Sequence, residues 1–261
     1  MHLSNIKKVF FSITQLCTNP GKSLSWVRRG GLLEDRVVID ESYWFLGTLP
    51  RKPLSVYFPH TKEVSVIIPR TFDRTFGTSI TVTEAVTLAA LVRNQNPKKI
   101  LEIGTFDGNT ALLFATNQHE EGRIVTVDLP PDFDPKKDQA TLKHAQVKVN
   151  VTPRAFVARQ YQESAETKKI TQVYGDSASL DWSQFGGPFE FIFIDGCHKA
   201  VYVRSDTENA MSHLAQNGLL VWHDYGVIPD VTSVVDAFAK THPELKMFVP
   251  EGTRLAVGIR Q

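Results

Sequence analysis

The hydrophobic pattern over residues 99–115 is the clearest in the chain. An apolar, β-branched run at residues 100–103 stops at Gly104, a second glycine follows at Gly108, and apolar residues recur at helical spacing from Ala111. This order predicts a strand, a tight glycine turn and a helix. In an open parallel sheet, such a turn lies at the carboxyl end of a strand, where ligands bind.

Short apolar runs and helical patterns alternate through the rest of the chain. The run at residues 189–194 is apolar on both faces, as expected for a central parallel strand. The pattern predicts an α/β, Rossmann-like, doubly wound fold, with a mostly parallel seven-stranded sheet and an antiparallel edge hairpin. Strands are expected at residues 99–103, 123–127, 170–174, 189–194, 219–222, 246–249 and 254–259, and helices at 83–94, 111–116, 153–166, 201–214 and 231–240.

Three details of this pattern are specific enough to check. Thr83 is the expected cap of the helix that begins there, with Glu84 in its first turn. Asn217-Gly218 is expected to end the helix at 201–214. The long, polar, lysine-rich stretch 132–162 is interpreted as an insertion over the edge of the sheet.

Residues 1–75 look different from residues 76–261, because they carry aromatic residues and prolines without a long period. A helix at 5–16, a turn at Asn19-Pro20-Gly21 and strands at 36–39 and 64–68 are expected there. Two interpretations stay open for this N-terminal segment: a helical cap or dimerisation arm, or a lid that contacts the substrate.

The composition limits the classes of molecule that the protein is expected to bind and the compartment in which it is expected to work. A net charge of +1 over 261 residues gives no electrostatic reason to expect nucleic acid or an acidic membrane. Cys17 and Cys197 are too few for a disulfide scaffold, which favours a reducing, cytoplasmic compartment. The apolar run at 9–16 before Cys17 is interrupted by polar residues, and bulky Leu16 lies where processing of a lipoprotein signal needs a small residue. We expect a small-molecule substrate and a homo-oligomer, a dimer.

Acidic residues follow the ends of successive predicted strands. A single acid at such a place is commonly a helix cap or a turn former. Several on one edge of a sheet repel one another unless a cation or hydrogen-bond donors meet them. The residues concerned are Glu102 with Asp107, then Asp128, Asp176, Asp195 and Asp224.

The glycine turn itself limits the ligand. Asp128 lies at about the distance along the chain at which a dinucleotide-binding domain places its ribose-binding acid. However, the GxGxxG fingerprint fails, because Phe106 and Asn109 stand at its second and third glycine positions. Phenylalanine leaves less room for a pyrophosphate. A nucleoside without phosphates fits better.

A complete set of contacts for such a nucleoside can be assigned. Glu102 and the amides of the turn could hold an amino-acid tail, Asp128 both ribose hydroxyls, and Asp176 with Ser177 an adenine edge. That set matches S-adenosylmethionine. The expected cofactor-binding residues are Glu102, Gly104, Thr105, Phe106, Asp107, Gly108, Asn109, Thr110, Asp128, Leu129, Asp176, Ser177 and Asp195.

The motifs LEIGTFDGNTALLFA, VTVDLP, YGDSAS and FEFIFIDGCHKAVYVRSDTENAMSHLAQNGLLVWHDYG resemble, in order, those of class I S-adenosylmethionine-dependent methyltransferases. The similarity is greatest to the catechol, caffeoyl-CoA and macrolide-sugar O-methyltransferases and runs from Gly77 to the C-terminus. In these relatives the acids that end the fourth and fifth strands bind a divalent metal, and a base follows the fourth strand. The resemblance therefore implies Asp195 and Asp224 as metal ligands and His198 as the base, with Asp195 also counted as catalytic.

Two positions depart from the family. Tyr225 replaces the asparagine of the catechol-type enzymes, and His223 replaces an acid of the macrolide-sugar enzymes. The expected metal is a divalent cation, Mg²⁺ or Mn²⁺, with His223 as a further candidate ligand. Because Mg²⁺ prefers oxygen ligands, His223 favours either a softer metal or no metal. His223 could instead orient Asp224. Cys197 is an improbable nucleophile, because neighbouring residues on a turn seldom face one another.

The prediction from sequence is a metal-assisted methyl transfer to a hydroxyl of a small molecule. The reaction needs an aligned nucleophile and a route for its proton, which a histidine near neutral pH supplies. Two alternatives stay open: a protein that binds S-adenosylmethionine without catalysis, and an NAD-dependent oxidoreductase on the same fold. The acceptor is not indicated; sugar, phenol and polyketide hydroxyls all fit.

Overall fold

The computed structural model describes residues 47–70, 80–149, 151 and 158–261. Residues Gly47–Gln261 form one compact unit, so residues 47–70 belong to the same unit as the sheet. The helix expected at 5–16, the turn at 19–21 and the strand at 36–39 lie outside the described residues, as does the beginning of the helix expected at 153–166.

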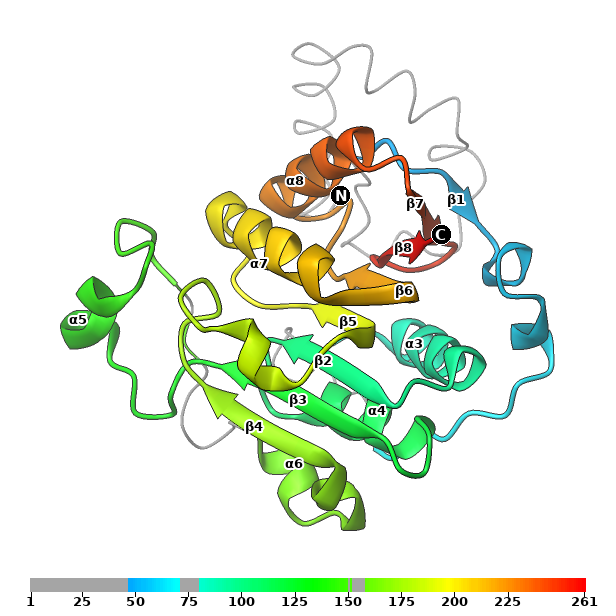
Figure 1. Ribbon diagram of the computed structural model, residues 1–261, viewed down its shortest axis with the longest axis horizontal. Helices are drawn as coiled ribbons and strands as arrows, with labels where there is room; N and C mark the ends of the chain where they lie inside the picture. Colours follow the sequence, from blue (N-terminus) through cyan, green and yellow to red (C-terminus); the bar gives the residue numbers. More distant parts are fainter. Residues whose placement is uncertain (1–46, 71–79, 150, 152–157) are drawn as a thin grey trace, which may run out of the picture. The chain divides into compact units, whose positions relative to one another are not determined.

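An eight-stranded sheet forms the centre of the described chain, in the order β1-β7-β8-β6-β5-β2-β3-β4 (Figure 1). All seven predicted strands are present. The eighth is the two-residue β1, which pairs in parallel with β7 beyond the predicted hairpin. Only β8 runs antiparallel to its neighbours. The strands are β1 (Arg51–Lys52), β2 (Lys99–Ile103), β3 (Arg123–Asp128), β4 (Ile170–Tyr174), β5 (Phe189–Ile194), β6 (Leu214–Trp222), β7 (Leu245–Pro250) and β8 (Ala256–Arg260).

Helices cover both faces of the sheet (Figure 1). Alternate residues of β5 divide between two cores: Ile192 and Ile194 pack with α7 and α8, and Phe191 and Phe193 with α3 and α4. This is the doubly wound arrangement. The helices are α3 (Val82–Gln95), α4 (Asn109–Asn117), α5 (Pro135–Asp138), α6 (Arg159–Gln162), α7 (Ala200–His213) and α8 (Pro229–Thr241), with 3₁₀ turns at Leu54–Val56, Pro59–Lys62, Gln139–Thr141, Ala165–Lys169 and Trp182–Phe185.

Two predictions at the ends of elements were wrong. The cap of α3 is Thr81 rather than Thr83: the Thr81 hydroxyl accepts from the Glu84 N–H, and the Glu84 carboxylate accepts from the Thr81 N–H. A reciprocal capping box satisfies two helix-end donors at once, which a cap at Thr83 would not do. Asn217-Gly218 does not separate α7 from the next strand, since β6 begins directly after the helix.

β6 is irregular where the helix stop was expected. Its pairing with β5 shifts between Phe189 and Phe191, and Asn217 has a φ of +61°. Asparagine tolerates this left-handed conformation, so the turn signal produces an irregularity within the strand instead of a loop.

Two further expectations differ from the structure. Residues 64–68 form no strand. In the described part of 153–166 the chain forms only α6 and the start of the 3₁₀ turn Ala165–Lys169, not a long helix. In the first case the backbone of Ile67 exchanges hydrogen bonds with the side chain of Asn117 instead of with a neighbouring strand. In the second, Ala158 and Tyr161 pack against Ala111 and Leu112 of α4. Tertiary contacts thus override the local propensity.

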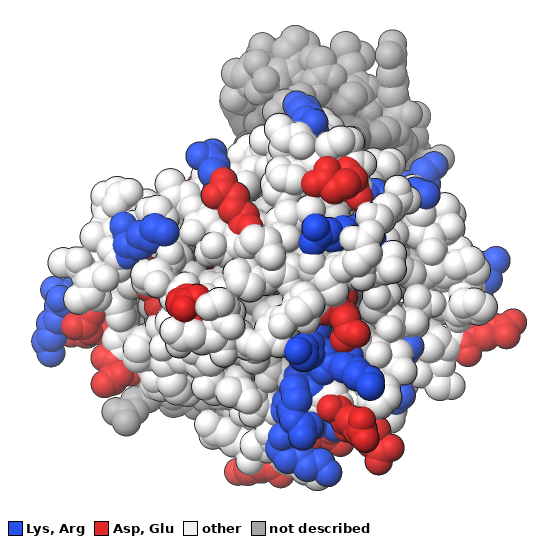
Figure 2. Space-filling view, viewed as in Figure 1, with Lys and Arg blue, Asp and Glu red and all other residues white. Residues whose placement is uncertain are grey.

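The surface carries both signs of charge. In Figure 2 basic and acidic side chains lie next to one another, and the largest basic group in that view is bordered by acidic side chains. Within the described ranges, none of the helices has the length and apolar character needed to cross a bilayer.

Candidate active site

The glycine turn (residues 104–108) connects β2 to α4 at the carboxyl edge of the sheet. Gly104 has a φ of +97°, and a Cβ there would lie 2.2 Å from the carbonyl oxygen of Asp195. Two backbone hydrogen bonds hold this contact: Gly104 N donates to Val127 O, and Asp195 N donates to Ile103 O, both at 2.8 Å. The turn and the catalytic candidate Asp195 are therefore packed backbone against backbone, which only glycine permits.

Asp128, at the end of β3, is oriented by two backbone amides. Phe106 N donates to Oδ2 at 2.8 Å and Leu129 N to Oδ1 at 2.7 Å. Phe106 itself has a φ of +48°, which turns its amide toward the carboxylate. Burial raises the pKa of Asp128. The turn ends at Gly108, the residue before α4, where Asp107 Oδ1 accepts from Asn109 N at 3.0 Å.

Asp176 follows β4 and is buried. Its Oδ2 accepts from Lys143 N at 2.8 Å and its Oδ1 from Ala178 N at 3.1 Å. The first contact ties the stretch after β3 to the end of β4. Ser177 uses its carbonyl to accept from the Trp182 indole at 2.9 Å. Asp128 and Asp176 thus lie on adjacent strand ends of the same edge, as predicted.

The side chains of two predicted cofactor-binding residues, Glu102 and Thr105, hydrogen-bond within the sheet. Glu102 has no exposed surface and accepts a hydrogen bond from Thr126, whose hydroxyl also lies 2.7 Å from that of Thr105. Burial raises the pKa of Glu102 well above its ordinary value. The side chains of Glu102 and Thr105 therefore support the glycine turn from inside the sheet, because the backbone leaving β2 directs them there. Thr110 and Leu129 are half-buried near the turn.

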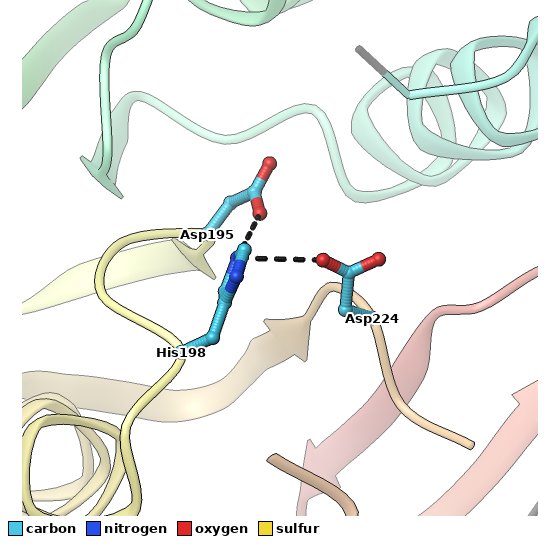
Figure 3. A group of neighbouring side chains, drawn as sticks. All are labelled: Asp195, His198 and Asp224. Atoms are coloured by element: carbon cyan, nitrogen blue, oxygen red, sulfur yellow. Dashed lines mark ion pairs between the residues drawn. The ribbon is translucent and has the colours of Figure 1, made fainter. Parts of the chain in front are cut away.

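Asp195, His198 and Asp224 come together at the ends of β5 and β6 (Figure 3). The Nε2 atom of His198 lies 3.3 Å from Oδ2 of Asp224 and 3.7 Å from Oδ1 of Asp195. The His198 side chain is 39% exposed, whereas the two carboxylates are mostly buried. The arrangement leaves an imidazole at the surface with carboxylates behind it.

Among the described residues, these three also form a group that could hold a metal ion. Each offers one ligand atom, and the three atoms lie within 4.8 Å of one another. The group contains His198 and not the predicted His223. His223 is buried, with Nδ1 3.1 Å from Asp195 Oδ1 and 3.5 Å from Asp224 Oδ1, and Nε2 3.3 Å from Glu84 Oε2. Since both ring nitrogens face carboxylates, both carry protons, and no lone pair is left for a metal.

Comparisons with known proteins find a family model and solved structures that resemble this chain. The family model described as a methyltransferase domain matches residues 101–225, from within β2 to the residue after Asp224. Residues 101–225, just under half of the chain, are therefore similar to methyltransferase domains. A sequence comparison with curated proteins gives no match.

Solved structures of methyltransferases are similar to this domain. SAH-bound PaMTH1 from Podospora anserina is 17% identical, with a TM-score of 0.51 over 78% of this chain and 93% of that one. The O-methyltransferase from Bacillus cereus in complex with SAH is 16% identical, with a TM-score of 0.48 over 70% and 83%. TomG from Streptomyces achromogenes, an O-methyltransferase involved in tomaymycin synthesis and solved with SAM, is 17% identical, with a TM-score of 0.46 over 70% and 82%. PaMTH1 shares the fold of the chain.

Two residues that contact this group of side chains, Glu84 and Arg254, were not predicted from the sequence to belong to it. Arg254 lies just before β8, and its guanidinium contacts both Glu84 and Asp224. Glu84 was assigned only to the first turn of a helix. The pattern Thr81-x-x-Glu84 marks a capping box, which could have predicted the helix start but not the contact with Arg254 across 170 positions.

In the network formed by Glu84, Arg254, His223, Asp195 and Asp224, each carboxylate contacts at least one cation. Burial opposes the charge of Glu84, but hydrogen bonds from His223 and Arg254 hold its pKa well below the ordinary value. Burial likewise opposes the charge of Asp195, but His223 and His198 lower its pKa to about 2. The buried carboxylates are therefore ionised at neutral pH.

The pKa values of the two histidines, by contrast, are raised. Burial disfavours the charged form of His223, but Asp195 and Asp224 raise its pKa well above 6.5. The hydrogen bond with Asp195 raises the pKa of His198, against the effect of its partial burial. His223 is thus a fixed cation of the domain, and His198 is the one that can exchange its proton with a ligand.

Proposed function

We propose that the methyltransferase domain binds S-adenosylmethionine and transfers its methyl group to a hydroxyl of a small molecule, with His198 as the general base. The observation that carries the proposal is the position of His198. Its half-exposed imidazole lies at the carboxyl edge, supported by Asp195 and Asp224, and Asp195 packs against the glycine turn. A base and a cofactor turn are thereby held next to each other.

The strand ends beside the turn support the cofactor assignment. Asp128 is held by two backbone amides, which leaves further lone pairs for ribose hydroxyls. Asp176 is held in the same way, and we assign to it the hydrogen bond from an adenine amine. The shared fold with SAH-bound PaMTH1 supports the same assignment. Backbone amides of the turn, rather than Glu102, would meet the amino-acid tail.

Methyl transfer needs alignment and a proton acceptor. Bound S-adenosylmethionine supplies a methyl group on a sulfonium, whose bond to sulfur breaks as the acceptor oxygen attacks in line, with the electron pair staying on sulfur. His198 Nε2 takes the hydroxyl proton as that oxygen attacks. Asp195 and Asp224 stabilise the imidazolium that results, and solvent at the half-exposed ring can remove the proton afterwards.

A divalent cation is a second candidate for this position, because two carboxylates and an imidazole converge there. Mixed nitrogen and oxygen donors fit Mn²⁺ better than Mg²⁺. Asp195, Asp224 and His198 would hold the ion, which would lower the pKa of the acceptor hydroxyl. A ligand bond through His198 Nε2 and proton transfer to the same atom exclude each other, so the two versions predict different responses to chelation.

The proposal is tested first by measuring cofactor binding and then by measuring methyl transfer. Calorimetry with S-adenosylmethionine, S-adenosylhomocysteine and NAD should show binding of the first two only. A screen of phenols, sugars and polyketides with labelled S-adenosylmethionine should then identify a methylated acceptor. Binding without transfer to any acceptor would favour the non-catalytic alternative, and binding of NAD alone would refute the proposal.

His198→Gln tests the base directly. We expect kcat to fall by about 10²- to 10⁴-fold with unchanged affinity for S-adenosylmethionine. Because the pKa of His198 is raised above 6.5, wild-type kcat should rise with pH through a value above 6.5, and the variant should lose this rise. Activity that survives EDTA supports His198 as the base, whereas loss restored by Mn²⁺ supports the cation. A variant with wild-type kcat would eliminate His198.

A further inference from the structure

The carboxylate of Glu84, fully buried at the start of α3, accepts five hydrogen bonds. Oε1 accepts from the backbone N and Nε of Arg254 at 2.8 and 2.9 Å. Oε2 accepts from Thr81 N at 2.7 Å, Arg254 Nη2 at 2.8 Å and His223 Nε2 at 3.3 Å. A helix cap needs only one of these contacts. The other four join α3 to the ends of β6 and the start of β8.

Arg254 and His223 each contact Glu84 and also contact the acids beside His198. Arg254 donates from Nη1 to Asp224 Oδ1 at 2.9 Å, while His223 places Nδ1 3.1 Å from Asp195 Oδ1. Arg254 therefore contacts Glu84 and Asp224, and His223 contacts Glu84, Asp195 and, at 3.5 Å, Asp224 as well. Asp195 and Asp224 are the two groups that contact His198 Nε2.

We propose that Glu84 is a positioning residue for methyl transfer: through Arg254 and His223 it fixes the carboxylates that orient His198. This inference rests on the proposed function. The hydrogen bonds and ion pairs of Glu84 within the described residues do not include His198, so we expect it to act through Arg254 and His223.

The chemistry of the five donors explains why a carboxylate is needed. All five partners donate, so an acceptor-only group satisfies them, whereas a glutamine would turn an NH₂ group toward N–H donors. Arg254 presents a planar fork whose Nε and Nη2 match the two oxygens of one carboxylate. In Glu84→Gln, Nε and Nη2 of Arg254 lose their charged acceptor, so the orientation of Nη1 toward Asp224 is expected to change and the carboxylate beside His198 to move with it.

The experiment compares Glu84→Gln with Thr81→Ala. Thr81→Ala removes the hydroxyl that accepts from Glu84 N but keeps the backbone N–H that Glu84 uses, so it weakens the same helix end and leaves Arg254 and His223 in place. Crystal structures of the wild type and both variants report the His198–Asp224 distance. Calorimetry with S-adenosylmethionine and turnover of the acceptor found in the screen report function.

For Glu84→Gln we expect kcat to fall by about 10- to 100-fold, as for other partners of site residues, with the KM for S-adenosylmethionine within about twofold of wild type. The His198–Asp224 contact should open beyond the ion-pair limit of about 4 Å. Thr81→Ala should keep wild-type kcat and geometry. An equal loss in both variants, or wild-type geometry in Glu84→Gln, would overturn the proposal.

The test still gives an answer if Glu84→Gln does not fold or if the wild type methylates no acceptor. If Glu84→Gln does not fold, Arg254→Lys replaces it: lysine keeps the charge but not the fork, and the same lengthened contact and lowered kcat are expected, with wild-type values refuting the role. If the wild type methylates no acceptor, the proposed function fails, while the crystal structures still decide whether Glu84 sets the positions of Asp224 and His198.

Discussion

Replacing Gly104 by alanine tests whether the glycine turn and the backbone at Asp195 form one rigid unit. The added Cβ would lie 2.2 Å from Asp195 O, whereas ordinary contact begins at 3.4 Å, so the two backbones must separate by about 1.2 Å. The hydrogen bonds Gly104 N to Val127 O and Asp195 N to Ile103 O oppose that movement. The clash cannot be relieved by rotating a side chain, because its partner is backbone.

Gly104→Ala is expected to lower the free energy of unfolding for three reasons. The positive φ costs a non-glycine residue roughly 1–2 kcal/mol. Overpacking against Asp195 adds about 1–3 kcal/mol. Loss of one of the two backbone hydrogen bonds adds about 1 kcal/mol. The total, about 3–6 kcal/mol, is a large share of the roughly 5–15 kcal/mol by which a domain is stable.

Gly186→Ala is the matched control. Gly186 also has a positive φ, +77°, but nothing lies within 4 Å of its added Cβ. Gly186→Ala should therefore lower the free energy of unfolding only by the roughly 1–2 kcal/mol that the positive φ costs. The difference between the two variants isolates the clash with Asp195.

Urea denaturation of both variants, followed by the fluorescence of buried Trp182 and Trp222, measures the two free energies of unfolding. Calorimetry should show that Gly104→Ala also lowers affinity for S-adenosylmethionine by more than tenfold, with Gly186→Ala unchanged. Equal destabilisation by the two substitutions would refute the reasoning, since it would mean that the contact between the turn and Asp195 costs nothing to disturb.

Two other outcomes follow from the site. Asp128→Asn keeps an acceptor for one backbone amide but loses the charge and the second acceptor, so we expect affinity for S-adenosylmethionine to fall by roughly tenfold or more with little change in melting temperature; unchanged affinity in calorimetry would remove Asp128 from the cofactor site. Asp195 has a pKa lowered from 3.8 to about 2, so its contribution to stability is present above pH 3.8 and is lost as the pH falls through about 2. The difference in unfolding free energy between wild type and Asp195→Asn should therefore shrink by roughly 2 kcal/mol between pH 5 and pH 2, and a constant difference would contradict the assigned pKa.

Much of the carboxyl edge could be predicted from the sequence. The positions of Asp128, Asp176 and Asp195 follow from one local rule, that each comes directly after an apolar run that forms a parallel strand. The same rule places Asp224 one residue after His223, beyond the end of β6. Parallel pairing of β4, β3, β2, β5 and β6 then brings these ends to one edge without further information.

The direction of individual side chains could not be predicted in this way. Glu102 and Thr105 lie in the expected segment, but their side chains hydrogen-bond inside the sheet. From the sequence, His198 was expected to be the base, and His223 either a metal ligand or a residue that orients Asp224. In the structure His198 reaches the surface, whereas His223 is enclosed by three carboxylates. Such differences depend on which neighbours fill the space, and these come from distant parts of the chain.

The sequence by itself thus determined the fold class, the glycine turn and the row of acids at strand ends, because each depends on residues close together along the chain. The tertiary structure alone decided what holds those acids. Glu84 and Arg254 meet although 170 positions separate them, and together they link the cap of α3 to Asp224 and, through His223, to Asp195. Periodicity carries no record of such a contact, because it forms only when α3 and β8 are packed against the same end of the sheet.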